Sequence, residues 1–406
     1  MTEAKTMKRI LRRNAGLLSL GGALLAIGPV SSVAQLGSPA IAQKDSNRLP
    51  APPADGVMGF VVQDFVAPVI QGKDACPLGT VPKIRDEYLQ SLPESERTRL
   101  RLKANEPELV KLWQASVFGP NNTNICSQPD MFTRPEMRTV QSKYSWGLDL
   151  DGGKGADTCA HEEFSTPSGD SGVDNQEYRV MGCTLEWRGV DGIAGDAAIG
   201  MRQFHASGEW TQVILLRGVD SLIMDEDVEV IYANTPDRPV QDSKGNFLRG
   251  ASFSVSTKLP RHRNVLRGRI ENGVLTTDPQ DIKLVETWGQ GGARDIRGNR
   301  SKFDYRRARL RLTFQPDGTL QGMFGGYKPV FDVIQSPGIG GVGSALVAGI
   351  DCAQYLQALR KYADGIRDPQ TGKCTGVSGA MRMSAIPAFV NDVPAAERSA
   401  QRTTKR

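Results

Sequence analysis

The chain has 406 residues, of which 39% are hydrophobic and 23% charged, a composition typical of globular proteins and a length greater than one minimal domain needs. Its formal charge is +5, but residues 1–34 contribute +4 of that total, with five Lys and Arg against the single acid Glu3. Because the rest of the chain is nearly neutral, its overall basicity does not support nucleic-acid binding.

The first 34 residues have the pattern of a secretory signal peptide. Basic residues between Lys8 and Arg13 precede an apolar stretch over residues 15–30, and small residues follow at Ser32 and Ala34, where a signal peptidase requires them. The alternative is a membrane anchor, but this stretch is shorter than the roughly 20 residues that span a bilayer. We therefore expect a soluble mature protein without a transmembrane segment, in the periplasm or outside the cell.

Six cysteines lie beyond this segment, which in an exported chain indicates disulfide bonds. We expect sequential pairing, because each neighbouring pair falls within one predicted structural unit. The expected pairs are Cys76–Cys126, Cys159–Cys183 and Cys352–Cys374. The three histidines lie far apart in the chain and give no indication of a zinc site.

The N-terminal part of the mature chain is predicted to be a Pro/Ala-rich linker over residues 35–57 and a small mixed α region over residues 58–135. Loose alternation over residues 57–69 indicates an edge strand. Helices are predicted between residues 84 and 118, with acidic residues in their first turns and Gly119 as their stop.

Residues 136–335 have the pattern of an antiparallel β domain. Residues 309–314 alternate between basic or polar and apolar side chains, Pro316-Asp317-Gly318 forms a turn, and residues 319–327 return, which predicts a hairpin. Asn272-Gly273 predicts a second hairpin. Strands at regular spacing favour a mainly β fold, an antiparallel β-sandwich of jelly-roll or concanavalin-like type.

The C-terminal part is predicted to be a Gly-rich connector and a helical, disulfide-closed extension over residues 336–390, followed by a basic disordered tail over residues 391–406. Gly338 to Gly343 match G-x-G-x-x-G formally, but too few residues follow to complete a dinucleotide-binding domain. A flexible connector is the better interpretation of these glycines.

An acidic segment carries the candidate metal ligands. They are Asp149, Asp151, Asp157, Asp170, Asp174 and Asn175. Alternating aspartates beside glycines place oxygen ligands around one point, as Ca²⁺ requires. Ala160 stands where an EF-hand has its bidentate glutamate, so we expect a loop site of another type. The alternative is that these residues simply form turns.

The same segment also offers a catalytic alternative. Glu162 and Glu163, together with Asp149 or Asp151, are candidates for the acid and base of a polysaccharide hydrolase. His161 lacks the second histidine four residues later that a metalloprotease motif requires.

Charge is unevenly distributed along the chain. Residues 149–229 hold 17 acids against 5 Lys and Arg, whereas residues 258–311 hold 14 Lys and Arg against 6 acids. Either these regions pair with each other, or they lie on separate faces and the basic one binds an anionic envelope polymer. The arginines of that basic face are Arg294, Arg297, Arg300, Arg306, Arg307, Arg309 and Arg311.

The chain resembles a group of exported bacterial proteins in the run Cys159-Ala-His-Glu-Glu-Phe-Ser-Thr-Pro-Ser-Gly-Asp-Ser-Gly-Val-Asp-Asn-Gln, and again in Arg217-Gly-Val-Asp220 and Asp225-Glu-Asp-Val-Glu-Val. The resemblance covers most of the mature chain and implies a shared fold and export, but no particular activity. The expected sandwich with its acidic loop is also similar in architecture to concanavalin-like and laminin-G-like modules.

These patterns together predict an exported binding or structural protein of the cell envelope, stabilised by calcium, rather than an enzyme. Its expected partner is an envelope polysaccharide or another envelope protein, and not nucleic acid. The alternative is a secreted polysaccharide hydrolase that acts through two carboxylates.

Overall fold

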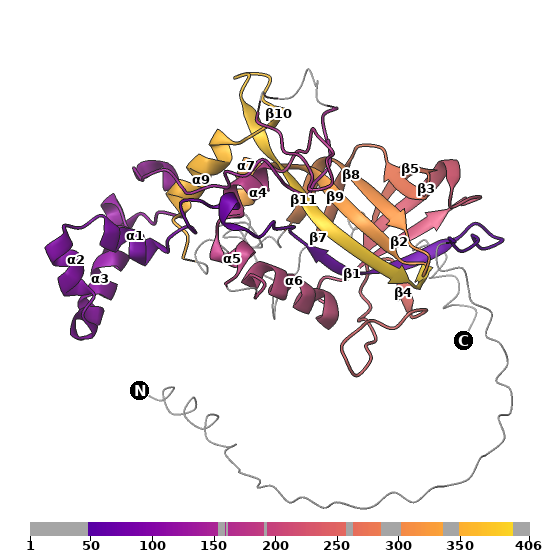
Figure 1. Ribbon diagram of the computed structural model, residues 1–406, viewed down its shortest axis with the longest axis horizontal. Helices are drawn as coiled ribbons and strands as arrows, with labels where there is room; N and C mark the ends of the chain where they lie inside the picture. The colour runs from indigo at the N-terminus through magenta and orange to yellow at the C-terminus, as the bar shows by residue number, and fades with distance from the viewer. Residues whose placement is uncertain are drawn as a thin grey trace, which may run out of the picture. The chain divides into compact units, whose positions relative to one another are not determined.

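In the computed structural model, eight antiparallel strands pair in the order β1-β2-β3-β5-β6-β8-β9-β11, and β11 pairs back onto β1, so that the sheet closes into a barrel (Figure 1). The barrel strands are β1 (Met58–Val66), β2 (Gln212–Arg217), β3 (Met224–Asn234), β5 (Arg263–Glu271), β6 (Val274–Thr277), β8 (Lys302–Phe314), β9 (Leu320–Pro329) and β11 (Cys374–Pro387).

The structure describes residues 48–152, 159, 161–190, 193–256, 263–285, 302–335 and 349–392. The predicted signal peptide, most of the predicted linker, the Gly-rich connector and all but the first two residues of the predicted tail lie outside the described residues. So does Asp157, one of the six predicted calcium ligands.

The closed barrel corrects the prediction of a β-sandwich of jelly-roll or concanavalin-like type. The seam joins β1 to β11, with Phe60 opposite Pro387 and Val66 opposite Arg382. The segment expected to be an edge strand therefore has a neighbour on each side, since β1 also pairs with β2. Alternating side chains produce the same sequence pattern in a sandwich and in a barrel, and only this long-range pairing distinguishes the two.

Both predicted hairpins are confirmed. β5 and β6 pair across Asn272-Gly273, and β8 and β9 pair across residues 315–319. Asn272 and Gly273 have φ angles of 52° and 79°. These are the left-handed conformations that a two-residue hairpin turn of type I′ requires and that Asn and Gly adopt most readily.

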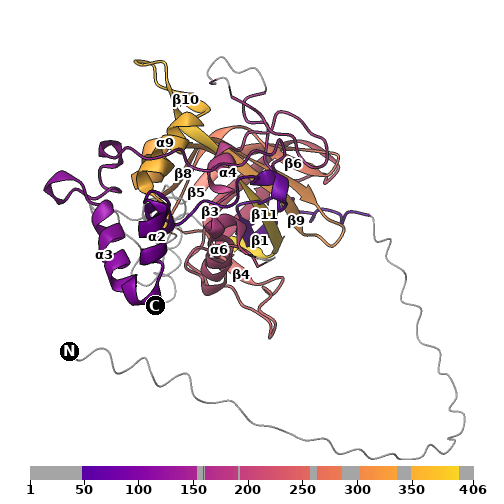
Figure 2. The same ribbon diagram turned by 60° about the vertical axis from the view of Figure 1, so that its left-hand side comes forward.

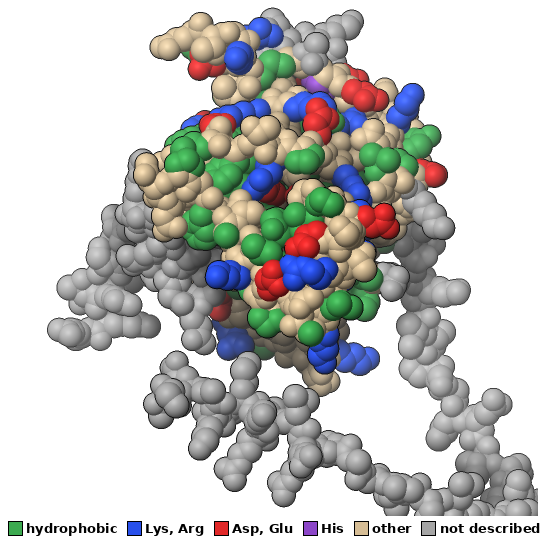
Figure 3. Space-filling view, turned by 90° about the vertical axis from the view of Figure 1, so that its left-hand side faces the viewer, with side chains coloured by type: hydrophobic (Ala, Val, Ile, Leu, Met, Phe, Trp, Pro, Cys, Tyr) green, Lys and Arg blue, Asp and Glu red, His purple; other side chains and the backbone are tan. Residues whose placement is uncertain are grey.

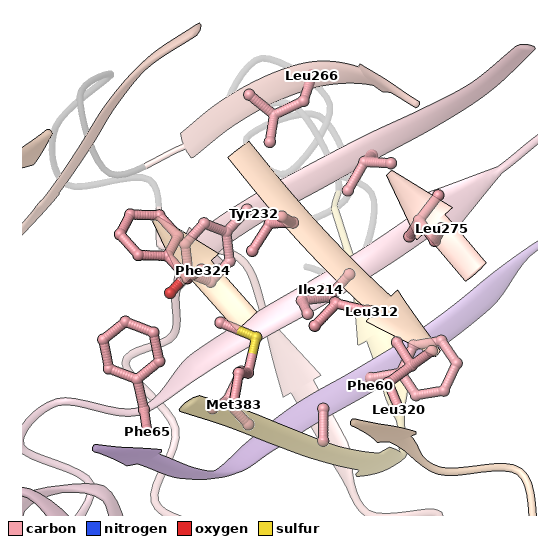
Figure 4. Close-up of a cluster of buried hydrophobic side chains, with 14 of the residues drawn as sticks. Phe60, Phe65, Ile214, Tyr232, Leu266, Leu275, Leu312, Leu320, Phe324 and Met383 are labelled. Carbon is pink, nitrogen blue, oxygen red and sulfur yellow. The ribbon is translucent and has the colours of Figure 1, made fainter. Parts of the chain in front are cut away.

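Hydrophobic side chains fill the interior of the barrel. Buried and exposed positions alternate strictly along most of β5, as expected when every second residue points inward. Figure 4 shows Phe60, Tyr232, Leu312, Phe324 and Met383 converging from different strands, and each is at most 1% exposed. An eight-stranded barrel has an interior just wide enough for side chains to fill, so this interior is a packed core.

Shorter strands extend or cover the barrel. β7 (Gln280–Val285) pairs with β8, and β10 (Gly365–Arg367) pairs with β11. β4 (Ser252–Ser254) and β12 (Phe389–Asn391) form a separate parallel pair. Hydrophobic residues around β4 and β12 pack on the outer face of the barrel, where Val61 and Val213 are buried.

Helices are present between residues 84 and 118, as predicted: α1 (Ile84–Gln90), α2 (Glu94–Leu100) and α3 (Glu106–Ser116) pack around Leu89, Leu100 and Leu109. The remaining helices lie beside one end of the barrel strands in Figure 1. They are α4 (Gln176–Met181), α5 (Leu185–Arg188), α6 (Asp196–Ser207), α7 (Val330–Gln335) and α9 (Cys352–Lys361). Short 3-10 turns are η1 (Lys73–Ala75), η2 (Lys103–Asn105), η3 (Pro120–Asn122) and η4 (Pro129–Met131). Among the described helices, none is long and hydrophobic enough to cross a membrane.

The expected helical C-terminal extension is largely a continuation of the barrel. Only α9 is helical after residue 349 in the described chain, and β10 and the 14-residue β11 follow it. Asp351 caps α9, because its side chain accepts hydrogen bonds from the backbone N–H groups of Ala353 and Gln354. The C-terminal segment thus supplies the strand that closes the barrel.

The prediction that the six cysteines form disulfide bonds is confirmed, but the predicted sequential pairing is wrong. The bonds are Cys76–Cys183, Cys126–Cys352 and Cys159–Cys374, with Cα–Cα distances of 5.8, 5.0 and 6.1 Å. Each joins segments more than 100 residues apart, and barrel closure brings Cys352 and Cys374 back to the N-terminal half. Two of them, Cys76–Cys183 and Cys126–Cys352, contribute to a second hydrophobic core among the helices.

Candidate functional site: a groove beside a buried histidine and aspartates

Three of the predicted calcium ligands are occupied by local hydrogen bonds. Asp149 Oδ1 accepts from the backbone N–H of Gly152 at 2.6 Å, and Asp170 Oδ2 accepts from the Thr166 hydroxyl at 2.9 Å. Asn175 caps α4, because its side chain accepts from the N–H of Tyr178. These contacts are typical of turns and helix caps.

The structure brings the other two described residues of that set, Asp151 and Asp174, together with His161. One ligand atom from each of these three side chains lies within 4.8 Å of the other two. His161 Nε2 is 2.7 Å from Asp174 Oδ1, and His161 Nδ1 is 2.8 Å from the carbonyl oxygen of Cys159. Because a carbonyl oxygen can only accept, Nδ1 carries a proton and donates it to this bond.

A further carboxylate, Asp364, joins the cluster from a distant part of the chain. Its Oδ2 lies 3.8 Å from His161 Nε2, and its Oδ1 accepts from the backbone N–H of Ser378 at 2.7 Å. Burial raises the pKa of Asp364 to about 7, although the Ser378 bond and the charge of His161 oppose this rise. Burial lowers the pKa of His161, but hydrogen bonds to Asp174 and the Cys159 carbonyl outweigh it and raise the pKa to about 9.

Sequence analysis missed two members of this histidine–aspartate cluster, which we define as Asp151, His161, Asp174 and Asp364. The only sequence signal for His161 was its place beside the acidic segment, and it has no second histidine at a recognised spacing. Nothing in the sequence connects Asp364 with the acidic segment. The two meet because Asp364 precedes β10, which pairs with the closing strand β11.

Two arginines of the expected basic face have partners, one of them in the backbone of the acidic segment. Arg306 pairs with Asp281, and Arg309 donates to the carbonyl oxygens of Asp149 and Leu150 at 3.2 and 3.1 Å. Arg294, Arg297 and Arg300 lie outside the described residues. Figure 3, which views the face carrying α1–α3, likewise shows Lys and Arg side chains interspersed with Asp and Glu.

A groove of about 1170 Å³ runs beside α9. Its walls come from residues 127–131, the start of α7, α9, β10, residues 371–375 and the cysteines of the Cys159–Cys374 disulfide. In Figures 1 and 2, α9 and β10 lie next to each other. Val330 and Leu356 are buried along the groove, whereas Met131 and Phe331 are 53% and 68% exposed. The surface of this α9 groove is therefore substantially apolar.

Cations outnumber anions in the lining of the α9 groove. The described lining residues include Arg360, Arg367 and Lys373 but a single acid, Asp130. Arg360 makes a bidentate ion pair with Asp130, and its hydrogen bonds lower the pKa of that carboxyl. Arg367 donates to the carbonyl oxygen of Gly372 at 3.2 Å, which keeps its guanidinium beside the turn before β11. Among the described lining residues, three cations therefore stand against one acid.

The groove and the histidine–aspartate cluster share one segment of wall. Cys159 lines the groove, its carbonyl oxygen bonds His161, and its backbone N–H points to the carbonyl oxygen of Asp364 at 3.5 Å. Ile366, between Asp364 and the groove residue Arg367, has a φ of 53°, a left-handed conformation that is unusual for a β-branched side chain. Strain of this kind persists only where the surrounding contacts hold it.

Comparison of the chain with models of protein families, with curated proteins and with solved structures finds no match.

Proposed function

We propose that this protein is an exported binding protein of the cell envelope and that the α9 groove holds an anionic amphiphile, a molecule with an apolar body and a carboxylate or phosphate group. The observation that carries this proposal is an apolar groove of about 1170 Å³ whose described lining contains the cations Arg360, Arg367 and Lys373 and one acid, Asp130. Ligand sites in proteins are typically concave and mostly apolar, with a few polar groups that fix the ligand's orientation.

The chemistry of the lining separates this ligand from the polysaccharide expected earlier. Phe331 is the only aromatic residue among the described residues of the lining, so the groove offers little surface for stacking of sugar rings. A carboxylate-dependent hydrolase needs two facing carboxyl groups. The described lining has one, Asp130, and Arg360 already engages it. Binding is therefore better supported than hydrolysis at this groove.

Export to an oxidising compartment is part of the proposal. The described residues include six cysteines, all paired in disulfides, and such bonds persist mainly in secreted and periplasmic proteins. The signal-peptide pattern of residues 1–34 supports the same location. Anionic amphiphiles are present in the cell envelope, since anionic membrane lipids belong to that class.

The test is a calorimetric titration of the oxidised mature protein with dodecanoate and, separately, with dodecylammonium, both below their micelle concentrations. The two probes share an apolar chain and differ in the sign of the head group. We expect saturable binding of dodecanoate with a stoichiometry near one and at least tenfold weaker binding of dodecylammonium. Equal affinity for both, or no binding of either, would contradict the proposal.

Charge-reversal variants locate the site. Arg367→Glu and Lys373→Glu should each weaken dodecanoate binding about tenfold, because each replaces an attractive rim charge with a repulsive one. The matched control is Arg311→Glu on the exposed face of β8, which reverses a charge away from the groove and should bind as the wild type does. Loss of binding in the control alone would place the site elsewhere.

A further inference from the structure

The histidine–aspartate cluster has its potential ligand atoms directed at one another. His161 Nε2 lies 2.7 Å from Asp174 Oδ1 and 3.8 Å from Asp364 Oδ2. An oxygen of Asp151 lies within 4.8 Å of a ligand atom of His161 and of Asp174. Two atoms that bind one ion at about 2 Å can be at most about 4 Å apart. The distances from His161 Nε2 to Asp174 Oδ1 and to Asp364 Oδ2 meet this limit, and Asp151 would join the same centre after a shift of its side chain.

The opposite atom of three of these side chains is held by the backbone. His161 Nδ1–H donates to a carbonyl oxygen, Asp174 Oδ2 accepts from the N–H of Leu150 at 2.7 Å, and Asp364 Oδ1 accepts from the N–H of Ser378. Metal-binding histidines usually donate their second ring N–H in this way, and ligating carboxylates are hydrogen-bonded in turn. These supporting bonds direct His161 Nε2, Asp174 Oδ1 and Asp364 Oδ2 toward one another, and a bound ion would replace the 2.7 Å hydrogen bond between Nε2 and Asp174 Oδ1.

An independent observation indicates that a bound cation belongs there. Asp364 and Asp174 are fully buried, and Asp364 Oδ2 has no hydrogen-bond partner among the described residues. The hydroxyl of Tyr327, whose side chain is also buried, has no such partner among the described residues either. Burial raises its pKa, and the nearby charges of Asp174, Asp364 and Asp151 raise it further. Buried polar atoms are normally paired, so the orphaned Asp364 oxygen beside the imidazole points to a missing ligand, and the orphaned Tyr327 hydroxyl near the same carboxylates supports it.

We propose that Asp151, His161, Asp174 and Asp364 bind one divalent transition-metal ion of the Zn²⁺ type. One imidazole with several carboxylates suits such ions, whereas Ca²⁺ takes six to eight oxygen ligands and no imidazole. The proposal thus moves the expected metal from a calcium loop to a site in which His161 is central. The ion joins the acidic segment to the residues before β10, as the Cys159–Cys374 disulfide does, and so braces the wall of the α9 groove.

The test uses the untagged, oxidised mature protein after treatment with EDTA. Zn²⁺ affinity is measured by competition with a chromophoric chelator, and the melting temperature is recorded with added Zn²⁺, Ca²⁺ or Mg²⁺. We expect one tightly bound Zn²⁺ per chain and a rise of several degrees at micromolar Zn²⁺, because an ion that binds only the folded state stabilises it. Millimolar Ca²⁺ or Mg²⁺ should have little effect. A chain that binds no Zn²⁺ would overturn the proposal.

Variants identify the ligands. His161→Gln and Asp364→Asn should each weaken Zn²⁺ binding at least tenfold, whereas the control Asp170→Asn, whose carboxylate bonds Thr166 in the same segment, should bind as the wild type does. Because a variant of a buried residue can fail to fold, the wild-type protein is also loaded with Co²⁺. Its visible absorption should show nitrogen and oxygen ligands and no thiolate band. Unchanged affinity in His161→Gln, or stabilisation by Ca²⁺ that Asp149→Asn abolishes, would contradict the site.

Discussion

The barrel interior and the helical layer beside it are both buried, but they are built from different side chains. The interior holds Phe60, Leu312, Phe324 and similar residues, whose burial needs no particular partner. The helical layer encloses charged groups, and each of them depends on a specific neighbour. Examples are the ion pairs Asp351–Arg134 and Glu177–Lys328, and the histidine–aspartate cluster.

This difference assigns most of the folding stability to the barrel interior and the candidate binding groups to the helical layer. A barrel core filled with hydrophobic side chains fixes the shape of the scaffold, and the groups that can recognise ions or anions lie outside that core. Lys328 marks the boundary: it extends from β9 to Glu177 of α4 at 2.7 Å and lies 4.9 Å from the ring centre of Tyr305. The proposed functions therefore depend on the layer outside the barrel, and substitutions in the two regions should have different consequences.

The largest effect is expected from Phe324→Ala in the barrel interior. Phe324 is fully buried among Phe65, Tyr232 and Tyr305, and its truncation leaves a cavity, so unfolding free energy should fall by about 3–5 kcal/mol. The control Phe331→Ala removes the same ring from a site that is 68% exposed and should cost about 0.5 kcal/mol or less. Urea denaturation measures both, and equal losses would contradict the packed-core description.

A comparable loss is expected at the boundary between the regions. Lys328→Met removes one partner of a buried ion pair and leaves the Glu177 carboxylate, which is 2% exposed, without its cation. Stability should fall by about 3 kcal/mol, and the double variant Lys328→Met/Glu177→Gln should recover part of that loss. A double-mutant cycle by urea denaturation gives the coupling between the two sites, and a coupling near zero would show that the pair is not specific.

Two of the disulfides, Cys76–Cys183 and Cys126–Cys352, belong to the helical layer, which yields the third expectation. Replacement of Cys126 and Cys352 by serine opens a loop of 226 residues and should lower the unfolding free energy by about 2–4 kcal/mol. Because this bond ties α9 to the segment between β1 and β2, amide protons of α9 should lose more protection from hydrogen exchange than those of β5. Equal loss in both elements would mean that the two regions unfold as one unit.

The smallest effect concerns pH. Burial, reinforced by the charge of Asp196, raises the pKa of Glu186 to about 7. The folded state then binds more protons than the unfolded state between pH 4.5 and 7, so this group's contribution to stability falls as pH rises through that window. Glu186→Gln should therefore reduce the decrease in unfolding free energy between pH 4.5 and 7 by on the order of 1–2 kcal/mol.

His205 has the opposite effect and requires a difference measurement. Burial lowers its pKa to about 4, so the folded state binds fewer protons and stability rises with pH between 4 and 6.5. Unfolding free energies of wild type and Glu186→Gln at pH 5 and pH 8 are therefore subtracted from each other, which cancels the His205 contribution. A difference that does not change with pH would show that Glu186 titrates normally.

Features encoded within a few residues could be predicted from the sequence. The hairpin at Asn272-Gly273 depends on two residues that tolerate left-handed backbone, and α3 depends on its acidic first turn and on Pro107. The overall mainly β character follows from the same local patterns. Each of these signals lies within the element that it specifies.

Features that depend on long-range contacts could not be predicted. Alternation in β1 indicates a strand, whereas β11 lies in a segment predicted to be helical, and no local pattern shows that the two pair and close a barrel. The Cys126–Cys352 and Cys159–Cys374 pairs and the approach of Asp364 to His161 follow from that closure. The acidic segment was identified as a candidate site, but which of its carboxylates point inward depends on where the backbone places them.

Hydrogen–deuterium exchange of the mature protein with and without dodecanoate tests the division between scaffold and binding layer most directly. We expect increased protection in α9, β10 and the first residues of β11, which border the α9 groove. We expect no change in the barrel strands β3 and β5, whose described residues do not line it. Protection centred on β3 and β5, or no change anywhere at saturating dodecanoate, would contradict the proposed binding site.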